Sequence, residues 1–419
     1  MLHSLLLSLL VEVRPRQYHD SIVLMVASAR MSALPGVEAA MAAMATPLNL
    51  ALLRETGLWT EELAAAGDTD LVLAARGAEA EAALRAGERA LSDRAPAGAP
   101  GDLPAPRTVR TAARWLEGAN VAVVSVPGEH AAWACWDALA AGLNVFCFSD
   151  HVSLADEIRL KDEALRRGLL MMGPDCGTAI LDGVGFGFSN AVPKGRVGIV
   201  GASGTGIQHL TCLLALQGVG ISQAIGVGGR DLSPEVGGRM TREAVRRLEA
   251  DPDTDRIVVV SKTTATDLTA LALEVGGGRL PPEPPPLAWS ARVEGIFSGG
   301  TLRDEAALIW GEDARFSAVD YGDERFTRAR PHPIIDNTLR LDAIRRAEGL
   351  VYLDVVLGRG AHPDPASELA PALGGRPAVV VLVGTDDDPQ GLGRQRSAFE
   401  AAGAAVFTSN SRAARAVKG

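Results

Sequence analysis

Apolar runs alternate with segments of helical periodicity along the whole chain. VAVVSVPG, LNVFCFSD and RVGIVGAS are continuous apolar runs, and amphipathic segments such as HAAWACWDALAAG and SLADEIRLKDEALRRG follow them. Apolar strands that are each followed by an amphipathic helix are typical of a parallel sheet with both faces covered. The pattern therefore predicts an α/β protein built from Rossmann-like and flavodoxin-like units with parallel sheets.

Stretches rich in proline and glycine divide this pattern. SDRAPAGAPGDLPAPR has no period and predicts a connector near 92–107, and a second Gly- and Pro-rich stretch runs from Thr263 to Pro286. We expect one Rossmann-like domain over 1–192 that includes the connector. Two smaller domains of flavodoxin type are expected to follow, over 193–290 and 291–419.

Charge and cysteine content exclude several classes of function. The chain has 41 basic and 51 acidic residues and a net charge of -10, so no basic field is available to collect nucleic acid. The four cysteines form no CxxC pair, and no clustered metal ligands are visible, so we expect no metal site. No apolar run approaches the ~20 residues of a membrane-spanning helix, and the opening MLHSLLLSLLVEV is interpreted as a buried strand. A cytoplasmic protein without a membrane partner is predicted.

The strongest chemical signal is VGIVGASGTGIQHL, in which a strand runs through a glycine-rich turn into a helix. The expected phosphate-binding residues of this turn are Gly201, Ser203, Gly204, Thr205 and Gly206. Glycines allow close approach of the backbone, hydroxyls donate, and a helix N-terminus offers free N–H groups with a favourable dipole. The turn is neither GxGxxG nor GxxxxGKS, so the alternative is a ligand-free turn between strand and helix.

His332 is the candidate catalytic residue. It lies between two prolines in RPHPIIDNTLRLDAI, just before a helix that we expect to be capped near Asp336 or Asn337. Prolines hold the backbone extended and present the imidazole rigidly at the helix start. The alternative is a structural loop histidine.

Two further turns follow the carboxyl ends of predicted strands, where ligands bind in open α/β sheets. The MGPDCGTAI turn supplies the candidate substrate-binding residues Pro174, Asp175, Cys176 and Gly177. No base adjacent to Cys176 can be named, so a buried turn cysteine is favoured over a nucleophile.

The second of these turns, in GVGGRDLSPEVGG, offers Arg230 and Asp231 for a carboxylate or phosphate, with a solvated charge pair as the alternative. A weaker glycine-rich turn, FSGGT, repeats the strand-turn-helix design at 297–301.

Taken in order, these motifs resemble the alpha subunit of succinyl-CoA synthetases. SIVLM, GPDCGT, GASGTGIQ, GGRDLS, GGTLRDEA, RPHPIID and LDVVLG resemble the FdrA family of acyl-CoA-synthetase-like proteins over nearly the whole chain. The resemblance implies a CoA-binding-type domain over 1–192, followed by two ligase domains over 193–290 and 291–419. It also implies that two helix N-termini hold a phosphate, one after Ser203 and one at Asp336 and Asn337.

Three features depart from the succinyl-CoA synthetase pattern. The Gly-His-Ala-Gly context of the phosphohistidine is missing, and His332 is not its positional equivalent. RPRQYHDS stands where a CoA-wrapping glycine-rich turn is expected, and the 263–294 segment is short, as if the first ligase domain were trimmed. No ATP-grasp domain is recognisable, so nucleotide chemistry would require a partner chain.

The resemblance implies an NDP-forming acyl-CoA synthetase subunit that handles an acyl phosphate or phosphate, with CoA as cofactor. A second candidate is a subunit of oxamate carbamoyltransferase, which converts oxalurate and phosphate to oxamate and carbamoyl phosphate in purine catabolism. There Arg230 would hold a carboxylate and His332 would serve as acid or base. A third candidate is a non-catalytic scaffold subunit that binds an effector. In each case we expect a homo- or hetero-oligomer with other subunits.

Overall fold

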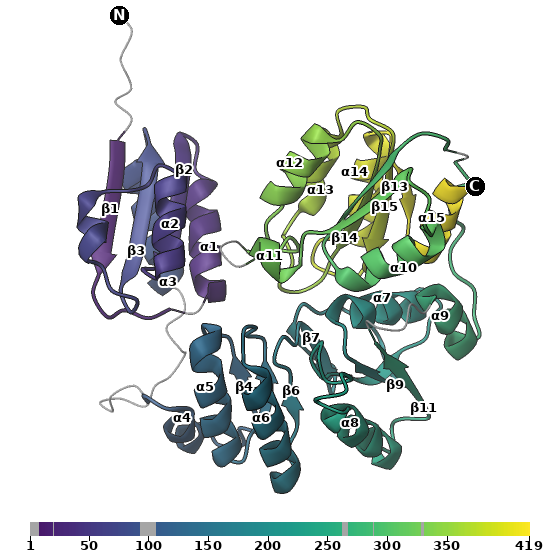
Figure 1. Cartoon of the computed structure of the whole chain (residues 1–419), viewed down its shortest axis with the longest axis horizontal. Coiled ribbons are helices and arrows are strands. Elements are labelled where there is room, and N and C mark those ends of the chain that lie inside the picture. The colour runs from purple at the N-terminus through teal and green to yellow at the C-terminus, as the bar shows by residue number, and fades with distance from the viewer. Residues whose placement is uncertain (1–7, 20, 93–105, 262–266, 288, 328–330) are drawn as a thin grey trace, which may run out of the picture. The chain divides into compact units, whose positions relative to one another are not determined.

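The chain forms two compact units, one up to Arg107 and the other from Thr108 to Gly419. The computed structural model describes residues 8–19, 21–92, 106–261, 267–287, 289–327 and 331–419 (Figure 1). The expected connector lies largely outside the described residues. The structure thus divides the single domain expected over 1–192 after Arg107.

The first unit is a three-stranded sheet with helices on both faces. Its elements are β1 (Ser8–Arg14), α1 (Ser21–Ser32), β2 (Val37–Met44), α2 (Pro47–Glu55), the short 3₁₀-helix η1 (Glu61–Ala65), β3 (Leu71–Gly77) and α3 (Ala80–Ser92). Buried residues of α1 and α3 pack on one face of β3, and Leu53 and Leu63 of α2 and η1 pack on the other. This arrangement explains why LVLAAR is a continuous apolar run.

The sheet of the first unit is antiparallel, not parallel as the sequence pattern suggested. Its order is β1-β3-β2, and β3 runs antiparallel to both neighbours. β1 and β2 are therefore parallel to each other with β3 inserted between them, which is a split βαβ arrangement. The hydrophobic pattern of β3 suggested a parallel strand because a strand that is buried on both faces is a continuous apolar run whether its neighbours are parallel or antiparallel. β1 was also expected to be buried, but all of its side chains are only half-buried.

The second unit begins with a small parallel sheet in the order β4-β5-β6. Its elements are α4 (Val109–Trp115), β4 (Val121–Val124), α5 (Gly128–Ala140), β5 (Asn144–Cys147), α6 (Leu154–Arg167) and β6 (Met171–Met172). The predicted alternation of strand and helix is confirmed here.

The next sheet is mixed, with the order β11-β9-β10-β7-β8. Its elements are β7 (Thr178–Leu181), β8 (Val184–Gly187), β9 (Lys194–Gly201), α7 (Gly204–Ala215), β10 (Ile221–Gly226), α8 (Arg239–Ala250), β11 (Arg256–Val260) and α9 (Leu268–Gly276). β9, β10 and β11 are parallel, and the β7-β8 hairpin adds antiparallel strands beside β10.

The last sheet is fully parallel, with the order β13-β12-β14-β15-β16. Its elements are β12 (Val293–Phe297), α10 (Gly300–Trp310), β13 (Phe316–Asp320), α11 (Glu324–Thr327), α12 (Thr338–Arg346), β14 (Leu350–Val356), α13 (Pro365–Leu373), β15 (Ala378–Val383), α14 (Leu392–Ala401), β16 (Ala405–Phe407) and α15 (Asn410–Lys418). In chain order this is the 2-1-3-4-5 arrangement of flavodoxin-like folds, which bind ligands at the switch point between the first and third strands. That switch point lies here between β12 and β14.

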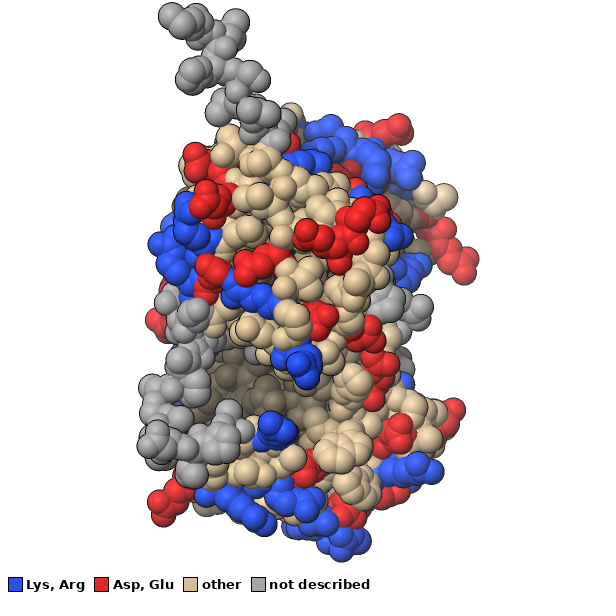
Figure 2. Space-filling view, turned by 90° about the vertical axis from the view of Figure 1, so that its left-hand side faces the viewer, with Lys and Arg blue, Asp and Glu red and all other residues tan. Residues whose placement is uncertain are grey.

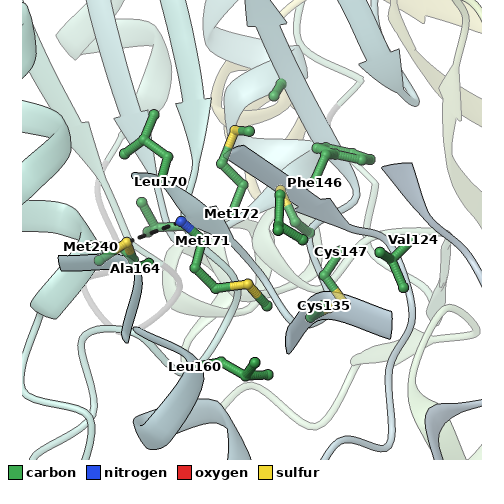
Figure 3. Close-up of a cluster of buried hydrophobic side chains, with 14 of the residues drawn as sticks. Val124, Cys135, Phe146, Cys147, Leu160, Ala164, Leu170, Met171, Met172 and Met240 are labelled. Atoms are coloured by element: carbon green, nitrogen blue, oxygen red, sulfur yellow. Dashed lines mark hydrogen bonds between the residues drawn. The ribbon is translucent and has the colours of Figure 1, made fainter. Parts of the chain in front are cut away.

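A sulfur-rich core joins the first two sheets of the second unit. Figure 3 shows Cys135, Cys147, Met171 and Met172 packed with Met240 of α8, and the Met171 amide donates to the Met240 sulfur at 3.3 Å. A hydrogen bond with the Cys147 thiol, together with burial, raises the pKa of the Cys135 thiol. These cysteines therefore serve as core residues.

Contacts between polar side chains tie the last sheet to the one before it. The Glu305 carboxylate of α10 accepts from the Leu268 amide at 2.8 Å, at the start of α9. Glu283 of the Pro-rich linker accepts from the Thr408 and Ser409 amides before α15.

Across the ranges that the structure describes, no helix is long and apolar enough to cross a membrane.

Candidate active site where two helices begin

Two glycine-rich turns meet in the second unit, and we call them together the twin-turn site. One is Ser203–Thr205, which follows β9 and begins α7, and the other is Gly299–Thr301, which follows β12 and begins α10. The Ser203 and Thr301 hydroxyls are hydrogen-bonded to each other, and both residues are buried. A Cβ at Gly299 would lie 2.4 Å from Thr205 Cγ2, so the glycine is what allows the two turns to touch. Figure 1 shows α10 above α7.

The two helix N-termini differ in how they are capped. Ser203 caps α7, since its Oγ accepts from the Gly206 amide at 3.0 Å. Gly299 is the N-cap of α10 and has no side chain to accept from that helix. The first turn of α10 thus keeps N–H groups that no capping side chain satisfies, which is the usual basis of anion binding.

An unpartnered hydroxyl lies beside the first turn. Thr178 is buried, its Oγ1 has no hydrogen-bond partner among the residues that the structure describes, and that oxygen lies 3.3 Å from the position of a Cβ on Gly204. The fully buried Ser298, which directly precedes the Gly299 turn, interacts through its side chain with Asp354. A buried hydroxyl without a partner is rare and unfavourable, so the position of Thr178 at a helix start suggests a ligand.

The glycines of the GASGTG turn have separate roles. A Cβ at Gly201 would lie 2.4 Å from Ile207 Cγ1, and one at Gly206 would lie 2.9 Å from both Ser203 Oγ and Val260 Cγ1. These two glycines are therefore required by packing. Gly204 alone faces the Thr178 hydroxyl.

His332 and Asp320 approach the same site from β13 and the loop after it. Asp320 Oδ2 lies 3.0 Å from the position of a Cβ on Gly300, and its Oδ1 accepts from the Gly322 amide at 2.8 Å. His332 Nε2 lies 2.7 Å from the position of a Cβ on Gly322. The predicted catalytic histidine thus faces the loop beside α10.

Hydrogen bonding and stacking fix the His332 ring. Its Nδ1 accepts from the Ile334 amide at 3.2 Å, and the ring packs against Phe188 at a centroid distance of 5.5 Å. In the neutral ring the proton must then be on Nε2. His332 therefore presents an N–H donor toward the loop rather than a lone pair.

A buried ion pair holds the turn that leads into α10. Asp354 of β14 accepts from the Ser298 amide at 2.6 Å through Oδ1, which lies 3.4 Å from Arg340 Nη1. Burial raises the pKa of Asp354, and the Arg340 guanidinium opposes that shift.

The helix at Asp336 and Asn337 is not the partner of α7. Asp336 Oδ1 accepts from the Thr338 amide at 2.8 Å. The Asn337 side chain bonds Arg340 and Glu368. The N-terminus of α7 contacts the N-terminus of α10. The second helix of the site is therefore α10, which begins at the FSGGT turn. The phosphate role predicted for Asp336 and Asn337 stays a prediction, since α10 is the helix whose start contacts the start of α7.

Asp231 belongs to a buried charge cluster, and the exposed Arg230 lies at its edge. Both Asp231 oxygens accept bonds at the start of α8, and Oδ1 also lies 2.8 Å from Lys161 Nζ. Arg230 Nε lies 2.8 Å from Glu157 Oε2, and its Nη2 donates to the Val152 carbonyl. These contacts give Asp231 a structural role, while the side chain of Arg230 is 46% exposed and its role in substrate binding stays a prediction.

The Pro174–Gly177 turn reaches the site only at its end. Gly177 Cα lies 3.6 Å from the position of a Cβ on Gly204, whereas the Pro174 carbonyl packs against Gly228. Asp175 is exposed, and its amide donates to the Ser149 carbonyl at 2.9 Å. Burial raises the pKa of Cys176 to about 12, so its thiol is not a nucleophile at neutral pH. Thr178, which the sequence reasoning did not single out, is the residue of this segment that faces α7.

Family models match three segments of the chain. A model described as AllF, heavy metal-associated domain matches residues 7–104, a CoA binding domain model matches 193–279, and a CoA-ligase model matches 296–419. The CoA binding model thus falls on the segment for which a first ligase domain was expected.

The segment that matches the heavy metal-associated domain model has no thiolate ligands for a metal. Residues 7–104 contain no cysteine, and His19 is their only histidine. Thiolates are the ligands that soft heavy metals prefer. Within the described ranges, no group of three or more His, Cys, Asp or Glu is placed to hold a metal ion.

The chain resembles several known proteins. It is 34% identical to YahF of Escherichia coli (strain K12) over 500 residues, covering 96% of this chain and 97% of YahF. It is 29% identical to the alpha-2 subunit of a mitochondrial ADP-forming succinate–CoA ligase of Trichomonas vaginalis, covering 51% of this chain and 70% of that one. With SauD of Bilophila wadsworthia, a subunit of an ADP-forming sulfoacetate-CoA ligase, it is 30% identical over 35% of this chain and 52% of SauD.

The alignment with YahF runs over 500 residues, more than the 419 of this chain, so YahF carries segments that this chain lacks. Among solved structures, a Methanosaeta concilii ATP citrate lyase aligns with a TM-score of 0.33 at 13% identity, covering 75% of this chain and 40% of that one. The chain belongs to the YahF family, with an AllF-type domain followed by CoA-binding and CoA-ligase domains like those of the succinate–CoA ligase-like acyl-CoA synthetases.

Proposed function

We propose that the chain is an FdrA-type subunit of an NDP-forming acyl-CoA synthetase that holds a phosphoryl group or acyl phosphate at the twin-turn site. The observation that carries the proposal is the contact between two helix starts, through the Ser203 to Thr301 hydrogen bond and the packing of Gly299 on Thr205. A dianion between two such helices gains from both dipoles and from the free N–H groups of α10.

A hydroxyl group would complete the anion site. Among the described residues, the Thr178 hydroxyl has no hydrogen-bond partner, so it is available to donate to a phosphate oxygen. The attraction of the site for an anion would therefore come from backbone dipoles and a hydroxyl group.

Asp320 gives the site a group that accepts protons. Its carboxylate lies beside Gly300 at the start of α10, where an acyl phosphate would develop charge during transfer. In this scheme His332 and Asp320 position the loop beside the start of α10. The role proposed for His332 is thus that of a positioning residue.

CoA and a nucleotide enter as proposed cofactors. Residues 193–279, which match the CoA binding domain model, contain the first of the two turns. CoA bound there would bring its thiol to an acyl phosphate at the twin-turn site, and its pantetheine arm would be bound by the same segment. We assign the nucleotide to a partner chain, so the working enzyme would be an oligomer with other subunits.

The Thr178→Val variant tests the phosphate site. Valine keeps the shape of threonine and removes a hydroxyl that has no hydrogen-bond partner among the described residues, so the fold should be as stable as before or more stable. Isothermal titration with inorganic phosphate should show at least a several-fold loss of affinity.

Thr211→Val is the matched control, because Thr211 is a buried threonine farther along α7 whose hydroxyl bonds the Gln208 carbonyl. It should bind phosphate like the wild type. Equal phosphate affinity in Thr178→Val and the wild type would refute the assignment of the site.

Carbamoyl transfer is the second candidate. It is favoured by the missing Gly-His-Ala-Gly tetrapeptide, because transfer between oxalurate and phosphate needs a phosphate site but no phosphohistidine. Binding assays with carbamoyl phosphate and with CoA separate the two candidates. Protection by carbamoyl phosphate without any response to CoA would replace the synthetase assignment with the transferase.

A further inference from the structure

Strand β1 forms an edge of the sheet in the first unit. The order β1-β3-β2 gives β1 a single neighbour within the described part of the chain (Figure 1). An edge strand presents a row of backbone N–H and C=O groups that another strand can pair with.

The two edges of this sheet are protected to different degrees. β2 carries a register shift between Val37 and Ala39, and the exposed Glu38 lies inside that irregularity. β1 pairs with β3 in unbroken register over all seven residues, from Ser8 to Arg14, and contains no proline. Bulges and unpaired charges are devices that block pairing at an edge. β2 has a bulge, whereas the two charged residues of β1, Glu12 and Arg14, form an ion pair with each other at 2.7 Å, so β1 is the less protected edge.

The side chains of β1 extend the apolar core toward this edge. Leu9, Val11 and Val13 pack against the cluster formed with α2 and η1, yet each remains half-buried. Figure 2 looks at the side on which β1 lies and shows uncharged residues at the centre of this unit's face, with acidic and basic residues around them. Pairing along β1 would complete the burial of these three side chains.

A second copy of the same strand fits this edge. Antiparallel pairing of a strand with its own copy is self-complementary across a two-fold axis. With Val11 on that axis, Leu9 of each chain lies opposite Val13 of the other, and Leu10 opposite Glu12. Ser8 then lies opposite Arg14, so no two like charges face each other.

We propose that the first unit is an assembly module, and that two chains associate through antiparallel pairing of their β1 strands about Val11. The unit matches a heavy metal-associated domain model but lacks cysteine, so its fold is retained here without soft-metal ligands. The pairing adds main-chain hydrogen bonds across the two chains and joins their sheets into one of six strands.

Cross-linking tests the predicted register. In a Val11→Cys chain the two new thiols lie opposite each other, within reach of a disulfide. Mild oxidation should convert most of the chains to a covalent dimer on a non-reducing gel. The four native cysteines are buried and should not contribute. Glu38→Cys on the opposite edge is the matched control and should remain uncrosslinked.

A charge swap tests the same axis without oxidation. Val11→Lys and Val11→Glu chains should each sediment as monomers, because like charges meet on the axis, and an equal mixture of the two should sediment at twice the 43.7 kDa chain mass. The mixture also controls for misfolding, because misfolded chains would not assemble on mixing. A monomeric wild type, a mixture that stays monomeric, or cross-linking through Glu38→Cys alone would overturn the proposal.

Discussion

Gly299→Ala should separate the two turns of the twin-turn site. The backbone of Gly299 has φ of −145°, which alanine adopts without strain, so the effect is one of space alone. The new Cβ would meet Thr205 Cγ2 at 2.4 Å, Oγ1 at 2.6 Å and Cβ at 2.8 Å. Ordinary contact begins near 3.4 Å, so the turns must move apart by about 1 Å.

The expected loss of stability has two sources. Overpacking of this kind costs ~1–3 kcal/mol. Alanine is also a poorer N-cap than glycine, which adds ~1 kcal/mol. Chemical unfolding should therefore show a loss of ~2–4 kcal/mol. Phosphate affinity should fall in the same variant, because the helix starts no longer converge on one anion.

A second substitution isolates the steric contribution. Thr205→Gly removes all three atoms that the new methyl would meet, so the double variant should recover ~1–3 kcal/mol relative to the sum of the single effects. Gly393→Ala in the first turn of α14 is the control, since its Cβ would find nothing closer than 3.6 Å. That control should be neutral or stabilising by up to ~1 kcal/mol. If Gly299→Ala behaves like Gly393→Ala, or if the cycle shows no coupling, the two turns are not in contact.

Two pH-dependent effects and one charge effect can be measured on the same chain. Burial lowers the pKa of His209 from 6.5 to about 4, so the stability that its neutral form provides is present above 6.5 and is lost as the pH falls toward 4. This loss is on the order of 3 kcal/mol and should vanish in His209→Leu, and a pH dependence equal to that of the wild type would contradict it. Burial raises the pKa of Glu305 from 4.5 to about 7. The stability that its protonated form provides is therefore present below pH 4.5 and is lost as the pH rises through 7. Glu305→Gln should remove this dependence, and a constant difference from the wild type across the range would exclude it. Lys161→Met removes the buried cation between the Glu157 and Asp231 carboxylates and should cost ~3–5 kcal/mol in chemical unfolding, whereas a change below ~1 kcal/mol would refute the buried cluster.

The sequence predicted the order of strands and helices better than it predicted how the strands pair in the sheets. The strand and helix order of the second unit follows from its apolar runs, because each run is buried between helices. The same signal in LVLAAR could not reveal that β3 pairs antiparallel with β1 and β2, since burial on both faces hides the direction of a strand. Direction depends on contacts between residues far apart in the chain.

The candidate site was predictable in part. GASGTG predicts a helix start whose free N–H groups can bind an anion. In the structure this start, that of α7, contacts the start of α10. The choice of the second helix depended on packing, because Gly299 and Thr205 are distant in sequence and touch only in the fold. Asp336 and Arg230 looked like ligand residues by type, yet their partners, the Thr338 amide and Glu157, engage them within the chain.

The most direct test of the proposed function is thermal unfolding of the chain with CoA, inorganic phosphate, acetyl phosphate or carbamoyl phosphate. A ligand that binds only the folded state stabilises it by ~2.7 kcal/mol at a hundredfold excess over its dissociation constant. We expect phosphate, acetyl phosphate and CoA each to raise the unfolding midpoint, and Thr178→Val to weaken the response to phosphate and acetyl phosphate. No response to CoA would contradict the synthetase assignment, and no response to any phosphate would contradict the twin-turn site itself.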